Sequence, residues 1–104
     1  MNRRYAALAC VLLGVSIVHA AEHSIGQKGR LFSPGVMRVK SGEVVVFKND
    51  DAVTHHVYSS TKGQEFDLST AKPGQEMRHT FSKPGRVDVR CGLHPGMRLA
   101  VTVE

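Results

Sequence analysis

The chain has 104 residues, a formal net charge of +5 and 41% hydrophobic residues. This length leaves room for one small domain with a modest core. Its lysines and arginines are scattered singly, without the basic runs and interleaved aromatic residues of nucleic-acid-binding proteins, so we expect no nucleic-acid partner.

Residues 1–20 are predicted to be a secretory signal peptide that is cleaved. Arg3 and Arg4 form a short basic region, residues 5–18 are mostly apolar, and small residues precede a cleavage position after Ala20. The apolar stretch is short for a membrane span, which favours a cleaved signal peptide. After its removal, we expect no stable membrane insertion of the remaining chain. A lipid anchor at Cys10 is the alternative, and it is disfavoured because most of the apolar stretch follows that cysteine.

Residues 21–104 would then form one exported domain in the periplasm, with a formal net charge of +3 after Arg3 and Arg4 are lost. Cys91 is the only cysteine of that domain, so it cannot form an intrachain disulfide. A free thiol in an oxidising compartment is prone to oxidation, and metal ligation is one way to protect it. The alternative is a buried, inert cysteine.

The domain shows β patterns throughout and no convincing helical period. Residues 43–47 form a continuous apolar run rich in β-branched residues, which predicts a central strand buried on both faces. Residues 86–91 and 98–103 alternate between apolar and polar side chains, so Cys91 faces the core at the end of a strand. Weaker strand patterns cover residues 23–28, 36–40, 55–59 and 76–81.

Turn signals separate these segments, and the polar stretch 60–71 is predicted to be a long surface connection with one irregular turn around residues 66–68. Several short strands at this spacing predict an all-β fold, either an antiparallel sandwich or a barrel.

The segment 90–98, Arg-Cys-Gly-Leu-His-Pro-Gly-Met-Arg, brings together three soft or borderline metal ligands. Cys91 offers a thiolate, His94 an imidazole and Met97 a thioether, with no carboxylate among them. His55, upstream of a strand pattern, could supply a second imidazole from a segment packed against this loop. Two histidines, one cysteine and a weak axial methionine are the ligand set of a blue-copper electron-transfer site.

Residues 21–104 resemble a cupredoxin of the plastocyanin and amicyanin type along nearly their whole length. The matching motifs are Gly42-x4-Phe47-x-Asn49-x-Asp51 leading into His55, Pro73-Gly74 ahead of Phe81, Pro84-Gly85 leading to Cys91, and Cys91-x2-His94-Pro95-x-Met97. The short gap between His94 and Met97 is similar to that of amicyanins.

This resemblance implies a Greek-key antiparallel β-sandwich of about seven to eight strands. It also implies one copper ion per chain that alternates between Cu(I) and Cu(II). His55, Cys91 and His94 would be the strong equatorial ligands, and Met97 the weak axial one.

Two positions depart from the family pattern. Where the family commonly has an asparagine that ties the ligand loops together, this chain has His56, which could make a similar hydrogen bond or compete with His55 for the metal. Strand alternation favours His55, because His56 should point to the opposite face. Gly92 and Leu93 replace a hydroxyl residue and a proline of amicyanins, which changes the hydrogen bonding near the sulfur.

Two other histidines are not expected to bind the metal. His23 lies near the new N-terminus at Ala21 and is expected to be solvated, whereas His79 shares strand parity with Phe81 and is expected to be partly buried.

The expected function is that of a monomeric periplasmic protein that carries single electrons and is not an enzyme. The resemblance implies that donor and acceptor proteins dock transiently near His94, on an apolar patch formed by residues 93–96. Arg90 and Arg98 could give this patch a basic rim.

Three other functions use the same residues. A copper storage or delivery protein would also use soft ligands, but the extra surface clusters of Met or His that often serve metal transfer are missing from the sequence. A thiol enzyme with Cys91 as nucleophile lacks an evident acid to orient its base, and leaves Met97 without a role. A structural zinc site is disfavoured because methionine is a poor zinc ligand and a second thiolate is lacking.

Overall fold

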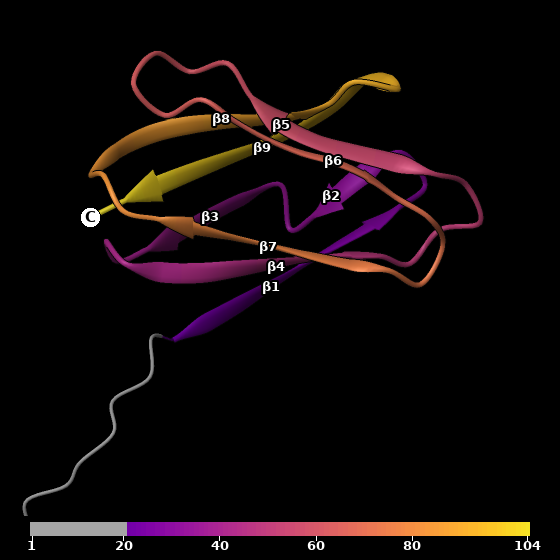
Figure 1. Cartoon of the computed structure of the whole chain (residues 1–104), viewed down its shortest axis with the longest axis horizontal. Helices are drawn as coiled ribbons and strands as arrows, with labels where there is room; N and C mark the ends of the chain where they lie inside the picture. Colours follow the sequence, from indigo (N-terminus) through magenta and orange to yellow (C-terminus); the bar gives the residue numbers. More distant parts are fainter. Residues whose placement is uncertain (1–20) are drawn as a thin grey trace, which may run out of the picture.

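The computed structural model describes residues 21–104, in which nine strands form two packed sheets (Figure 1). The predictions of a signal peptide and of a lipid anchor at Cys10 concern residues that lie outside this range. Within the described range, no helix has the length and apolar character needed to cross a membrane. The nine strands in two packed sheets confirm the expected all-β sandwich.

The sheets divide the strands as follows. The four-stranded sheet has the order β2-β1-β4-β7, and the five-stranded sheet has the order β3-β9-β8-β5-β6. The strands of the first sheet are β1 (Glu22–Lys28), β2 (Leu31–Ser33), β4 (Glu43–Asn49) and β7 (Glu76–Phe81). Those of the second sheet are β3 (Val36–Val39), β5 (His55–Ser59), β6 (Phe66–Ala71), β8 (Gly85–Cys91) and β9 (His94–Val103).

Two of the nine strands were not predicted from the sequence, β2 and β6. The expectation that residues 60–71 form only a surface connection was wrong, because residues 66–71 pair with β5 as the edge strand of their sheet. An edge strand that faces water on one side carries polar residues and lacks the apolar run of a central strand. In addition, β9 begins at His94 instead of at residue 98.

Most neighbouring strands are antiparallel, as predicted, but two pairs are parallel. β1 pairs with β4 from Glu22↔Val44 to Gln27↔Asn49, and β3 pairs with β9 along the last strand of the chain. Parallel neighbours need a long crossover connection, and here that connection contains other strands. The sequence pattern of a single strand does not reveal this direction.

The core lies between the two sheets and is built from alternating inward-facing residues. Phe47 of β4 is fully buried and meets the ring of Phe32 edge-on, with 6.2 Å between the ring centroids. Burying a side chain of this kind contributes about 1.5–3 kcal/mol. Other buried core residues on the central strands include Ile25, Val45, Val57, Val87, Val89, Leu99, Val101 and Val103.

The sheet order brings three strand ends to one end of the sandwich. β5 pairs antiparallel with β8 at Tyr58↔Arg90, and β8 pairs antiparallel with β9, where Cys91 lies opposite His94. Consequently the start of β5, the end of β8 and the start of β9 are adjacent. These are the positions of His55, Cys91 and His94.

Candidate metal centre

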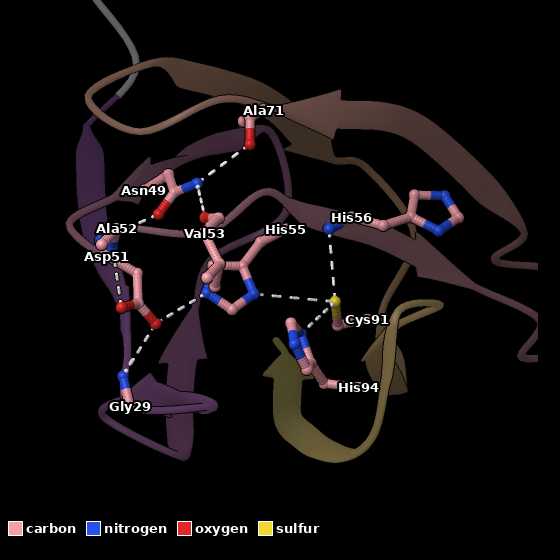
Figure 2. A network of polar contacts seen from close by, with 10 residues as sticks. All are labelled: Gly29, Asn49, Asp51, Ala52, Val53, His55, His56, Ala71, Cys91 and His94. Atoms are coloured by element: carbon pink, nitrogen blue, oxygen red, sulfur yellow. Dashed lines mark hydrogen bonds and ion pairs between the residues drawn. The ribbon is translucent and has the colours of Figure 1, made fainter.

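Three of the predicted ligands converge on a small volume (Figure 2). Sγ of Cys91 lies 3.8 Å from Nδ1 of His55 and 3.6 Å from Nδ1 of His94. The three ligand atoms lie within 4.8 Å of one another. Two ligands held at bonds of about 2.0–2.3 Å in a tetrahedral arrangement are roughly 3.5 Å apart, so this spacing fits one shared metal ion.

The fourth predicted ligand, Met97, is fully buried on β9 and belongs to the same core cluster as Cys91. It also lines the surface depression that His94 lines. A thiolate, two imidazoles and a thioether form a donor set suited to copper in both oxidation states. The residues present therefore fit the metal that the sequence implies.

Asp51 orients the buried ring of His55. Oδ2 of Asp51 lies 3.0 Å from Nε2 of His55, and the same carboxylate accepts the backbone N–H groups of Gly29 and Ala52. An ionised carboxylate only accepts hydrogen bonds, so Nε2–H of His55 must donate, and in the neutral ring Nδ1 is then the free acceptor that faces Cys91. The hydrogen bond from His55 is the main cause that lowers the pKa of Asp51.

The segment that carries Asp51 is held in turn by Asn49, which is fully buried. The side-chain Nδ2 of Asn49 donates to the backbone oxygens of Val53 (2.8 Å) and Ala71 (2.9 Å), and its Oδ1 accepts the N–H of Asp51 (2.9 Å). These bonds tie the β4–β5 connection to β6. These hydrogen bonds hold the segment whose Asp51 orients the ring of His55.

His56 takes no part in the converging set through its side chain. Its ring points away from Cys91 in Figure 2, lies 2.8 Å through Nε2 from Oδ1 of Asp67, and stacks on Tyr58 with 5.0 Å between centroids. Its backbone N–H, however, donates to Sγ of Cys91 at 3.2 Å. The ring of His56 thus points away from Cys91 while the ring of His55 meets it, as strand alternation predicted.

Gly92 packs against the other edge of the His56 ring. A Cβ atom at Gly92 would overlap Nδ1 of His56. Oδ1 of Asp67 also accepts the N–H of Ser69 at 2.7 Å, and the bond with His56 is the main cause that lowers the pKa of Asp67. We call His56, Asp67 and Gly92 the His56 clasp, because they join β5, β6 and the loop after β8.

The surface beside the converging ligands is a shallow depression. It is lined by Arg30, Leu93, His94, Pro95, Gly96 and Met97. Leu93 is 53% exposed, and His94 is half-buried. The cation that lines this depression is Arg30, from the turn between β1 and β2, which sequence reasoning missed because it lies far from residues 90–98 along the chain.

The two histidines expected outside the site do lie elsewhere. His79 stacks on Phe66 with 3.7 Å between centroids, and burial lowers its pKa. His23 is less solvated than expected, since its side chain is only 32% exposed and its Nε2 lies 3.0 Å from Oε1 of Glu43. His23 lies on β1, which pairs with β4, so the carboxylate of Glu43 is within hydrogen-bond distance.

Known proteins resemble this chain in sequence and in fold. The family described as copper binding proteins, plastocyanin/azurin family, matches residues 20–104. The methylamine utilization protein MauL of Methylorubrum extorquens is 32% identical over 74 residues, which cover 70% of this chain and 64% of MauL. Amicyanin-alpha of the same organism is 33% identical over 76 residues, with the same coverage.

The chain thus spans 64% of the length of both relatives. Among solved structures, a reduced form of an amicyanin mutant has a TM-score of 0.74 and 26% sequence identity, covering 86% of this chain and 87% of its own.

Proposed function

Because this chain belongs to the plastocyanin/azurin family of copper-binding proteins, we propose that it carries single electrons between a donor and an acceptor protein. Copper, when bound, supplies the one-electron Cu(I)/Cu(II) couple. In this proposal His55, Cys91 and His94 are the equatorial ligands and Met97 is the axial one. The convergence of three ligand atoms within 4.8 Å is the observation that carries it.

The chain's own part is to keep the ligand geometry nearly unchanged between the two oxidation states. Asp51 and the Asn49 network fix the ring of His55, so this ligand has little freedom to move. The backbone N–H of His56 donates to Sγ of Cys91 and stabilises negative charge on the sulfur. Hydrogen bonds of this kind around a metal ligand tune its electronic properties.

Electrons would enter and leave through the exposed edge of His94. Its ring is half-buried, contacts Sγ of Cys91 at 3.6 Å and borders the depression that includes Leu93 and Arg30. A small surface that includes apolar side chains suits a small, transient contact with a redox partner. The positive charge of Arg30 favours a partner with an acidic surface.

The proposal includes export to the periplasm after cleavage following Ala20, a monomeric state, and no catalysed reaction of a substrate. Intact mass spectrometry of the periplasmic protein tests the first point, because the mature chain should begin at Ala21. Size-exclusion chromatography with light scattering tests the second.

The decisive experiment is an absorption spectrum of the Cu(II)-loaded protein, combined with voltammetry. We expect an intense visible thiolate-to-copper band and reversible one-electron reduction. Cys91→Ser should lose the band, whereas His79→Gln, which removes a histidine outside the site, should keep it. A colourless cupric protein, or tight Cu(I) binding without reversible cycling, would contradict the electron-carrier function.

A further inference from the structure

A second group of metal-binding atoms lies at the start of the domain, away from Cys91. If export removes residues 1–20, as proposed above, the mature chain begins Ala21-Glu22-His23 with a free α-amine. An amine, the next two backbone amides and an imidazole on the third residue can close consecutive chelate rings around one ion. Four nitrogen donors in a plane suit Cu(II) and Ni(II).

One ring nitrogen of His23 already has a fixed partner. Its Nε2 lies 3.0 Å from Oε1 of Glu43, and that oxygen also accepts the backbone N–H of Lys40 at 2.6 Å. The bond from Lys40, followed by the one from His23, lowers the pKa of Glu43, so its carboxylate is ionised at neutral pH. Nε2–H of His23 must therefore donate, and in the neutral ring this tautomer leaves Nδ1 as the free ligand atom.

Nδ1 is the ring nitrogen closer to the backbone, and it is the one that can close a chelate ring with the amide of its own residue. Histidines that bind metals commonly donate their other ring N–H to a carboxylate, as His23 does to Glu43. The contact between His23 and Glu43 thus favours the tautomer of His23 in which Nδ1 is free to bind a metal.

The fold leaves these three residues accessible. Ala21 and Glu22 are exposed, and His23 is partly exposed. Val44 donates its N–H to the oxygen of Ala21 at 3.1 Å, and this end of β1 must leave the ladder to wrap an ion. The remainder of β1, as far as Gln27↔Asn49, stays paired with β4, so only the end of the strand is lost.

We propose that Ala21, Glu22 and His23 bind a second ion, Cu(II) or Ni(II), through the α-amine, the amide nitrogens of Glu22 and His23, and Nδ1 of His23. Binding releases the two amide protons to solvent and transfers no electrons. Anionic amide donors do not suit Cu(I), which prefers thiolate and thioether ligands. This ion therefore stays divalent, and a fully loaded chain holds two metal ions of different chemistry.

Ni(II) is the probe, added to the exported protein after copper has been loaded at the cysteine site. We expect one equivalent to bind with the visible absorption and diamagnetism of square-planar Ni(II), and the thiolate-to-copper band to stay unchanged. His23→Gln should lose this Ni(II). Inserting one alanine between Ala21 and Glu22 should lose it too, because this keeps every side chain but moves the imidazole out of chelating position.

Two further variants complete the design. Glu43→Gln should weaken Ni(II) binding by about tenfold or more, as expected for a carboxylate that orients a metal-bound histidine. His79→Gln, the matched histidine control, should bind Ni(II) like the original protein. An exported chain that begins at a residue other than Ala21, no Ni(II) uptake, or equal uptake by His23→Gln would each overturn the proposal.

The thiolate-to-copper band is recorded in the same samples, so the two proposals fail separately. A missing band with Ni(II) bound counts against the electron carrier, and a normal band without Ni(II) uptake counts against the N-terminal site.

Discussion

The two histidines proposed as equatorial ligands lie in very different surroundings. His55 is fully buried, and its ring is fixed by Asp51, which the Asn49 network holds in place. His94 is half-buried at the start of β9, next to exposed residues 93, 95 and 96, and its ring meets Sγ of Cys91 and the ring of His55. One histidine is thus held by hydrogen bonds within the protein, and the other lies half-buried beside exposed residues.

The largest expected effect comes from removing the hydrogen bond that fixes the buried histidine, His55. Asp51→Ala should lower copper affinity about ten- to a hundredfold, because His55 loses the acceptor that fixes its ring and tautomer. Competition with a chelator measures this affinity. Asp50→Ala is the matched control, since the carboxylate of Asp50 forms its ion pair with Lys48 at the surface, at 3.9 Å. Equal affinities of the two variants would contradict the role of Asp51.

A substitution at Gly92, in the loop after β8, should disturb the His56 clasp. Gly92→Ala should destabilise the protein by about 1–3 kcal/mol in denaturant unfolding, because the added Cβ overlaps the ring of His56. Gly96→Ala serves as the control, as nothing lies within 4 Å of its Cβ position.

Combining Gly92→Ala with His56→Asn should recover part of that loss, since the smaller side chain makes room. Strictly additive effects of the two substitutions would show that the overlap is not the cause.

Met97→Leu should leave copper bound but raise the reduction potential. Removing a weak donor to Cu(II) favours the cuprous form, and the change in side-chain volume is small. Voltammetry measures the shift, and Met37→Leu, a change at a partly buried methionine of β3, is the control. An unchanged or lower potential would argue against Met97 as the axial ligand.

The smallest effect is expected at His79, which lies outside the ligand set. Burial lowers its pKa from the usual 6.5, so the folded state prefers the neutral ring. Its contribution to stability is present above pH 6.5 and is lost as pH falls through the lower folded-state pKa. His79→Phe should therefore show a shallower loss of unfolding free energy on acidification, and parallel curves for both proteins would contradict this.

The sequence was most informative where one residue's environment follows from its own neighbours. The run at 43–47 predicted the strand β4, and the residue types at 55, 91 and 94 pointed to three side chains whose ligand atoms the structure brings within 4.8 Å of one another. Alternation along β5 correctly predicted that the rings of His55 and His56 point in different directions, the first to Cys91 and the second to Asp67. These features could be predicted from the pattern of neighbouring residues and from the chemistry of the side chains.

Contacts between distant segments could not be predicted in the same way. Asp67 meets His56 only because residues 66–71 form an edge strand, and Gly92 meets His56 only because β5 and β8 are neighbours. Arg30 joins the depression beside His94 through the packing of the two sheets. The sequence also contained Asp51 four residues before His55, but nothing local distinguishes a carboxylate that orients a ring from one in solvent.

The position of Arg30 has a mechanical consequence for any protein that docks on this depression. Arg30 lies in the turn between β1 and β2 of the four-stranded sheet, whereas Leu93 lies in the turn between β8 and β9 of the five-stranded one. A docked protein that touches both residues braces the sandwich across its open end and resists separation of its layers. Such a complex would slow amide hydrogen exchange in both sheets at once, not only beneath the contact.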